Sequence, residues 1–263
     1  MLKKRIIPKL LIKHRTLGPV VRPVLVTTIG YRDVREVGDP ISQAKIYEAQ
    51  FADELIVLNI DGTPIAGDEM MLGMIERLAS ETFMPLAVGG GVRTADDFGT
   101  LLQRGADKVT ICRQAVDEPA LITEAASRYG AQCVVVSIDY RVNEAGVAEV
   151  FADNGARPTG LGVLDFAQKV HALGAGEILL TNADRDGSGQ GIDVGLLRQV
   201  TDSLPIPVIA SGGCGLAAHF TEALAEGRAE GVAAGTFFCF RDQNPMQARA
   251  HVRTAGIPIR AET

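Results

Sequence analysis

Two glycine-rich segments have the residue types and the spacing of phosphate-binding turns. Gly89-Gly90-Gly91 follows the apolar run 84–88, and Gly212-Gly213 follows the apolar run 206–210. Each is followed by a stretch with a helical pattern. Glycines that leave a strand and enter a helix expose backbone N–H groups at the positive end of the helix, which is where β/α barrels hold phosphate. The repeated pattern therefore predicts two phosphate sites.

Eight short apolar runs alternate with helical patterns, and these elements must position the glycine turns. The runs are residues 5–12, 54–60, 85–88, 108–112, 133–138, 177–181, 207–210 and 231–234. Their nearly continuous hydrophobicity is typical of parallel strands packed on both faces. Eight alternations favour a (β/α)8 barrel, an α/β fold, over a doubly wound sheet.

The second half of the sequence repeats the first at an offset of about 122 to 128 residues. Residues 53–62 align with 176–185, and the opening run 6–11 aligns with 134–139. We therefore expect one domain, residues 1–263, built from two half-barrels at about 1–125 and 126–263. In this alignment Leu11 stands where the second half has Asp139.

Composition excludes several other classes of protein. The net charge of −6 argues against nucleic-acid binding, which depends on an excess of Lys and Arg. The four cysteines and four histidines show no metal-ligand spacing, so we expect no metal or cofactor and reduced thiols. The basic start at Lys3-Lys4-Arg5 is followed by too short an apolar run for a signal peptide or a membrane span. A cytoplasmic location is predicted.

Two irregular stretches follow the first and fifth predicted strands. Residues 15–28 contain Gly18-Pro19 and Arg22-Pro23, which break any helix, so a long loop at the C-terminal mouth of the barrel is expected. Residues 143–159 have a hairpin-like centre at 146–151 and then a second loop. These stretches are either flaps over the mouth or ordinary surface loops.

The motifs taken together resemble the cyclase subunit of imidazole glycerol phosphate synthase, the histidine-pathway barrel that receives ammonia from a separate glutaminase. The resemblance covers nearly the whole chain and rests on residues 4–8, 38–40, 52–55, 88–93, 105–109, 174–181, 184–187 and 209–213. It implies a glutaminase partner, because no cysteine here has the context of a glutaminase nucleophile.

The resemblance also implies an ammonia entrance at the bottom of the barrel. The family closes that end with two basic and two acidic residues, and the matching positions are Arg5, Glu54, Lys108 and Glu177. They stand at strand starts, two from each half, which predicts that they converge on the axis; the alternative is a set of unrelated surface ion pairs. Asp107 matches the family residue that pairs with a lysine of the docked glutaminase.

At the mouth, the family uses one aspartate from strand one and one from strand five as general acid and base. Asp139 retains the second, whereas Leu11 replaces the first. By the same resemblance, Thr181 and Asp186 position the substrate, and the two phosphate cradles comprise Gly90, Gly91, Gly212, Gly213, Ala234 and Gly235. Arg113 either adds charge to one cradle or points outward.

Further departures favour a different reaction. Lys9-Leu10-Leu11 replaces the family's Cys-Leu-Asp, Cys112-Arg113 replaces an Asn-Thr pair, Asn59 replaces an aspartate, and a loop lysine of the family falls on Thr27. These changes resemble the paralogous branch that works in acetamidino modification of surface sugars. That resemblance implies a phosphorylated small molecule or nucleotide-sugar as substrate. It also implies a further amidotransferase or ligase as a candidate third partner. The alternatives are an authentic histidine-pathway cyclase and a non-catalytic scaffold that activates the glutaminase.

Overall fold

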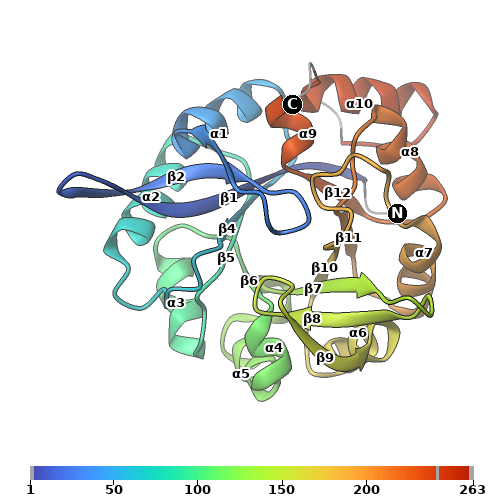
Figure 1. Cartoon of the computed structure of the whole chain (residues 1–263), viewed down its shortest axis with the longest axis horizontal. Helices are drawn as coiled ribbons and strands as arrows, with labels where there is room; N and C mark the ends of the chain where they lie inside the picture. Colours follow the sequence, from blue (N-terminus) through green and yellow to red (C-terminus); the bar gives the residue numbers. More distant parts are fainter. Residues whose placement is uncertain (1–2, 241–242, 261–263) are drawn as a thin grey trace.

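Eight parallel strands close into a barrel in the computed structural model, which describes residues 3–240 and 243–260 (Figure 1). They are β1 (Arg5–Leu17), β4 (Leu55–Asn59), β5 (Leu86–Gly89), β6 (Lys108–Ile111), β7 (Val134–Val142), β10 (Glu177–Asn182), β11 (Val208–Ser211) and β12 (Gly231–Ala234). The barrel is closed because β1 pairs with β12 and β7 pairs with β10. The predicted (β/α)8 fold is confirmed.

Helices surround the barrel on its outside (Figure 1). They are α1 (Pro40–Ala49), α2 (Glu69–Glu81), α3 (Ala95–Gln103), α4 (Arg113–Asp117), α5 (Ala120–Tyr129), α6 (Val163–Ala172), α7 (Val194–Ser203), α8 (Ala217–Ala225), α9 (Thr236–Phe240) and α10 (Pro245–Thr254), with the short 3₁₀ helix η1 (Ala131–Cys133) before β7. Asp39, Asp68 and Thr94 start their helices with side-chain caps, which satisfy free backbone N–H groups. In the described residues, no helix is both long and apolar enough to cross a membrane.

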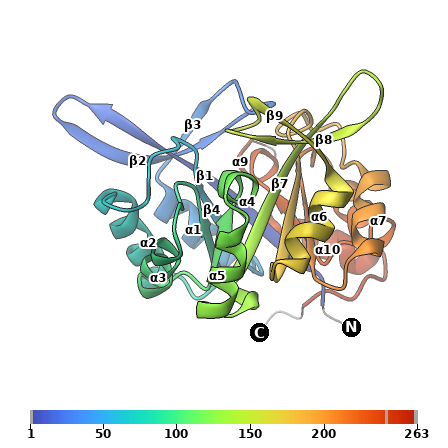
Figure 2. The same ribbon diagram turned by 90° about the horizontal axis from the view of Figure 1, so that it is seen from below.

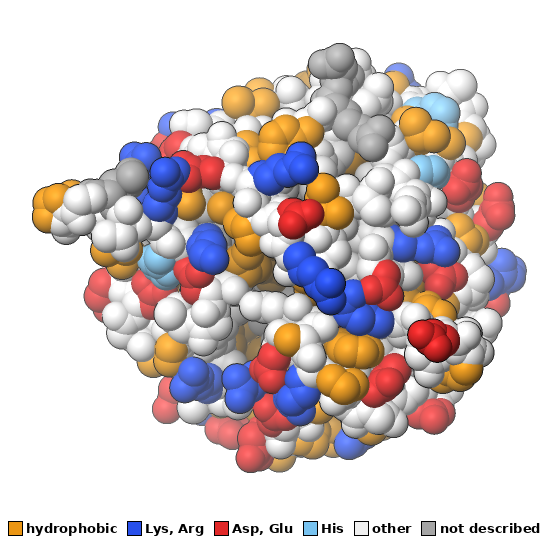
Figure 3. All heavy atoms as spheres, in the orientation of Figure 1, with side chains coloured by type: hydrophobic (Ala, Val, Ile, Leu, Met, Phe, Trp, Pro, Cys, Tyr) orange, Lys and Arg blue, Asp and Glu red, His pale blue; other side chains and the backbone are white. Residues whose placement is uncertain are grey.

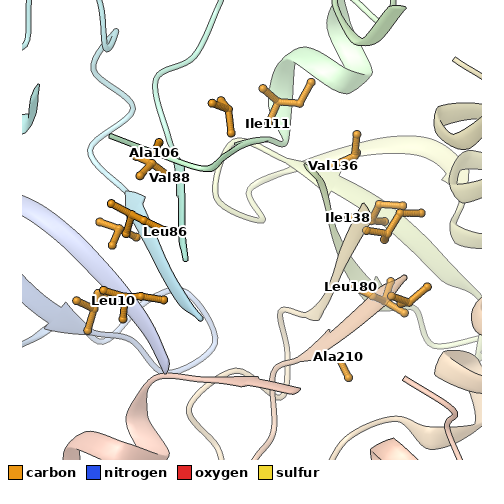
Figure 4. Close-up of a cluster of buried hydrophobic side chains, with 14 of the residues drawn as sticks. Leu10, Leu86, Val88, Ala106, Ile111, Val136, Ile138, Leu180 and Ala210 are labelled. Carbon is orange, nitrogen blue, oxygen red and sulfur yellow. The ribbon is translucent and has the colours of Figure 1, made fainter. Parts of the chain in front are cut away.

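The two faces of each barrel strand contact different partners, because side chains alternate along a strand. The outward residues, such as Leu10, Val88 and Ile138, belong to the large hydrophobic core between barrel and helices (Figure 4). The inward residues form a separate apolar cluster made by Ile7, Ile56, Ala87, Val135, Leu179, Ile209 and Ala233. Further along the strands, the buried inward residues become polar: Lys9, Thr110, Ser137, Thr181 and Ser211. The barrel interior therefore changes from apolar to polar toward the mouth.

The segment 15–28 is a β-hairpin, so the prediction of a long loop there was wrong. β1 continues beyond the barrel wall to Leu17 and pairs antiparallel with β2 (Val20–Thr27), which pairs in turn with β3 (Arg35–Gly38). Gly18, at φ +60°, makes the turn. Pro23 is tolerated because it lies where β2 pairs only with β1, so its missing N–H is not needed on the other edge.

The segment after the fifth barrel strand forms a second antiparallel extension. β7 pairs with β8 (Ala148–Ala152), as the hairpin-like sequence predicted, and β8 pairs with β9 (Arg157–Gly162), where a loop was expected. Figure 2 shows that this hairpin and the β1–β2 hairpin extend from the same end of the barrel. The two extensions come from corresponding strands of the two halves and flank the mouth.

Candidate active site

The four predicted entrance residues meet at the start of the barrel as a ring of alternating charges, called here the charged ring (Arg5, Glu54, Lys108 and Glu177). Arg5 Nη1 lies 2.6 Å from Glu54 Oε2, and its Nη2 contacts Glu177 Oε1. Lys108 Nζ lies 2.9 Å from Glu54 Oε1 and 2.8 Å from Glu177 Oε2. Each cation thus bridges both carboxylates, which unrelated surface pairs would not do.

The opposite charges within the charged ring compensate for the burial of its members. Burial alone would raise the pKa of Glu177, but the adjacent Arg5 and Lys108 cations outweigh burial and lower it. Burial alone would likewise lower the pKa of Arg5, but Glu177 and Glu54 raise it. Glu54 and Glu177 are almost fully buried. The charged ring therefore closes the barrel bottom without leaving an unpaired charge there.

Asp107 lies beside the charged ring and is exposed. Its Oδ2 accepts a hydrogen bond from the Leu86 backbone N–H at 2.8 Å, which fixes the carboxylate at the start of β5. Asp107 is therefore an exposed carboxylate with a fixed orientation at the strand starts.

A cavity of about 780 Å³ opens at the opposite end of the barrel. It is lined from several strands, with Asp139, Ser137, Thr110, Thr181 and Lys9 among its residues. Figure 3 shows this face, with Lys and Arg side chains near a central hollow. Pockets that bind small molecules commonly have a volume in this range.

Asp139, at the end of β7, is the buried carboxyl of this cavity. Ser137 Oγ donates to Asp139 Oδ1 at 3.1 Å, and Cys112 Sγ approaches its Oδ2 at 3.6 Å. Burial raises the pKa of Asp139, while the nearby Lys9 charge and the hydrogen bonds from Ser137, Tyr31 and Cys112 act against that rise. A buried carboxyl with a raised pKa in a cleft is suited to take and return protons.

Tyr31 covers Asp139 from the loop after β2, and the sequence did not reveal it. Its backbone is in the left-handed region, at φ +65°, which is uncommon for a bulky residue. Burial and the carboxylates of Asp139 and Asp186 raise the pKa of Tyr31 well above its ordinary value, so its phenol stays protonated. This strained tyrosine presents a hydrogen-bond donor to the carboxyl.

Asp186, in the loop after β10, is held from two sides. Lys9 Nζ lies 3.1 Å from its Oδ1, and Thr28 Oγ1 donates to its Oδ2 at 2.9 Å. Thr181 lies on β10 opposite Asp139 on β7 and is buried. The structure therefore brings all three candidate catalytic residues to the mouth, but Asp186 is engaged by a cation.

The first predicted phosphate cradle lies on the wall of the same cavity. Gly90 and Gly91 have φ values of +91° and +77°, and a Cβ on Gly90 would lie 2.0 Å from the Asn59 carbonyl oxygen. Only glycine fits at such a position. The turn leads into α3, whose N-cap Thr94 completes a capping box with Asp97.

The second cradle repeats the arrangement at the corresponding strand of the other half. A Cβ on Gly212 would lie 2.4 Å from the carbonyl oxygen of Asn182, which is the counterpart of Asn59. A small pocket there is lined by Gly212, Gly213, Ala234 and Gly235, together with Asp186. The two glycine turns thus use the same backbone contact in both halves.

Substituting Gly90 by alanine is expected to destabilise the fold by more than the conformational penalty of about 1–2 kcal/mol for a left-handed residue, because the new Cβ would also clash with Asn59. Gly67→Ala is the matched control, since Gly67 has φ +84° but no atom within 4 Å of its Cβ position. Urea unfolding of the two variants measures the difference, and equal losses would contradict the steric argument.

Arg113 lies at the rim of the cavity and is mostly exposed. Its Nε lies 3.1 Å from Asp117 Oδ2 and 3.3 Å from Asp153 Oδ1. These two carboxylates neutralise the guanidinium, so Arg113 reaches a phosphate only by leaving them.

The part of the mouth around Leu11 is apolar. Leu11 packs against Val24 and Val26 at the base of the β1–β2 hairpin, and Leu58 and Ile60 extend this cluster. The position that corresponds to Asp139 is therefore filled by a hydrophobic contact, which cannot transfer a proton.

Known proteins match this chain over nearly its whole length. Residues 5–244 match the family described as "Histidine biosynthesis protein". A protein of Prochlorococcus marinus (strain MIT 9313), described as "Putative imidazole glycerol phosphate synthase subunit hisF2", is 47% identical over 264 residues, covering all of both chains. Barrel, charged ring and similarity agree: the chain belongs to the histidine biosynthesis protein family and is related to the cyclase-type subunit of imidazole glycerol phosphate synthase.

Proposed function

We propose that this chain is the ammonia-accepting synthase subunit of a cytoplasmic glutamine amidotransferase complex, and that it forms C–N bonds in acetamidino modification of a sugar. A glutaminase docks at the strand starts beside Asp107, ammonia crosses the charged ring, and amidation takes place at or beyond the mouth. The observation that carries the proposal is the axial order: a closed ring of charges, an apolar interior, then a polar cavity containing Asp139.

The assignment to sugar modification, rather than histidine synthesis, is supported by the two sides of the mouth. Asp139 has the surroundings of a proton-transfer group, whereas Leu11 lies in an apolar cluster with Val24 and Val26. Loss of one member of an acid/base pair lowers a rate by about 10² to 10⁴. Ring closure of the histidine-pathway ribonucleotide should therefore be slow. The two glycine turns remain, and we expect them to hold a different phosphorylated acceptor.

The second candidate is the authentic histidine-pathway cyclase. It is favoured by the name of the Prochlorococcus relative and by the two preserved glycine turns. A scaffold that only activates its glutaminase is the third; it predicts faster glutamine hydrolysis without any aminated product.

To separate these candidates, the purified chain is mixed with its glutaminase and with ammonium. One sample receives the histidine-pathway ribonucleotide, and another receives a nucleotide-linked acetamido sugar with ATP. The sugar reaction is run with and without the candidate third partner, a further amidotransferase or ligase. We expect little ribonucleotide turnover and amidine formation from the sugar. Rapid ribonucleotide turnover would contradict the sugar assignment and favour the cyclase.

Leu11→Asp is expected to raise ribonucleotide turnover only slightly. The new carboxyl would have to displace the contacts with Val24 and Val26, and burying it there is costly. Steady-state kinetics of this variant, with Leu11→Asn as the uncharged control, measures the effect. A gain of about a hundredfold or more would mean that Leu11 alone blocks the cyclase reaction.

A further inference from the structure

Lys9 is a buried lysine at the point where the barrel interior opens into the cavity. It is 4% exposed and lines that cavity. Lysines are almost never this buried unless paired. Its ammonium lies 3.1 Å from Asp186 Oδ1 and 3.0 Å from Ser211 Oγ. In the part of the chain that the structure describes, those are its two hydrogen-bond partners, so the third N–H of the ammonium is left for a ligand in the cavity.

Lys9 lies on the same strand as Leu11, at the preceding inward position of β1. Both residues point into the barrel, and Lys9 lies two residues deeper, about 6.6 Å at 3.3 Å per residue. A lysine side chain spans a similar length, and the contact with Asp186, which follows β10, shows that Lys9 reaches toward the mouth. The ammonium therefore lies in the cavity beside the loop that carries Asp186.

The groups around Lys9 respond to its charge. Asp186 and Ser211 contact the Lys9 ammonium. Across the cavity, the positive charge of Lys9 acts to lower the pKa of Asp139. Burial raises the pKa of the Cys214 thiol to about 12, and Lys9 acts against that rise. Lys9 is thus a cation near both candidate carboxyls.

We propose that Lys9 is the proton donor of the acid/base pair at the mouth, with Asp139 as the base and an acceptor carbonyl or imine carbon as the site of attack. This inference deepens the proposed function and rests on it.

The ammonia nitrogen bonds to the acceptor carbon as the π pair of the C=O or C=N bond moves to the heteroatom. That atom takes a proton from Lys9 Nζ, and Asp139 takes one from the new N–H₃⁺ group, giving a neutral amine adduct. Proton exchange with water in the open cavity restores both residues.

Three variants test the proposal in the complex with the glutaminase. Lys9→Met removes the charge and keeps the length, whereas Lys9→Arg keeps a charge that does not release a proton near neutral pH. Lys45→Met, on the exposed side of α1, is the control. With ammonium and the nucleotide-linked acetamido sugar as acceptor, both Lys9 variants should lose activity about a hundredfold, and Lys45→Met should not. Full activity of either Lys9 variant would overturn the proposal.

A second measurement needs no substrate. The titration of Asp139 is followed by ¹³C NMR in aspartate-labelled protein, with Asp139→Asn identifying the signal. Lys9→Met should shift the Asp139 midpoint to higher pH, and Lys9→Arg should leave it nearly unchanged. If the wild-type complex does not aminate the sugar, the proposed function fails, and the role of Lys9 is then judged from this titration alone. An unchanged Asp139 midpoint in Lys9→Met would overturn that role.

Discussion

Asp139→Asn is expected to lower ammonium-dependent product formation by about 10² to 10⁴ without unfolding the protein. The amide has the shape of the carboxyl and can still accept from Ser137, but it cannot take a proton from the attacking nitrogen. The measurement is the steady-state rate of the purified complex with saturating ammonium. Asp165→Asn is the control, since Asp165 lies in the first turn of α6 and does not line the cavity.

The same substitution should raise thermal stability at neutral pH. Because burial raises the pKa of Asp139, ionising it costs stability as pH rises above the ordinary carboxyl range, and asparagine removes that cost. The gain should vanish as pH falls to where the Asp139 carboxyl is protonated in both states. Thermal unfolding across pH checks this, and a variant that is less stable than wild type at neutral pH would show that Asp139 is structural.

Arg5→Met is expected to lower the free energy of unfolding by about 3–5 kcal/mol, the usual loss when one partner of a buried ion pair is removed. Arg5 bridges Glu54 and Glu177, so the variant leaves two buried carboxylates that share only Lys108. Arg128→Met is the control, since its partners Asp96 and Glu124 are exposed and such pairs contribute little. Urea unfolding measures both losses.

The Arg5→Met loss should depend on pH in a defined direction. Because Arg5 and Lys108 lower the pKa of Glu177, the ring stabilises the fold at pH above the ordinary glutamate range and loses this contribution as pH falls through the folded pKa. The difference between wild type and variant is therefore largest at neutral pH and smaller in acid. If Arg5→Met lost the same free energy of unfolding at neutral and at acid pH, packing rather than charge would explain the loss.

The barrel was predictable from periodic patterns, and the four residues of the charged ring were identified through the resemblance to the family. Each barrel strand is a short apolar run between helices, and Arg5, Glu54, Lys108 and Glu177 stand at strand starts in both halves. Side-chain alternation then places them on the axis. The glycine turns were predictable because each glycine run follows an apolar run and precedes a helical pattern. In the structure, a Cβ at Gly90 or Gly212 would have no room.

The contacts at the mouth were not predictable, because they join loops that are distant in sequence. Residues 15–28 contain helix breakers, and whether they form a loop or a hairpin depends on pairing with the extension of β1. Tyr31 lies over Asp139, more than a hundred residues away. Lys9 did carry a signal: it is a charged residue at an inward position of an apolar strand, two residues after Ile7.

The most direct test of ammonia transfer through the barrel is an isotope competition in the intact complex. Amide-¹⁵N glutamine is supplied with an excess of unlabelled ammonium, and the isotope content of the aminated product is measured by mass spectrometry. Transfer through the charged ring predicts a product that carries mainly the glutamine label at a pH where free ammonia is scarce. A product whose label matches the bulk ammonium pool would contradict passage through the barrel.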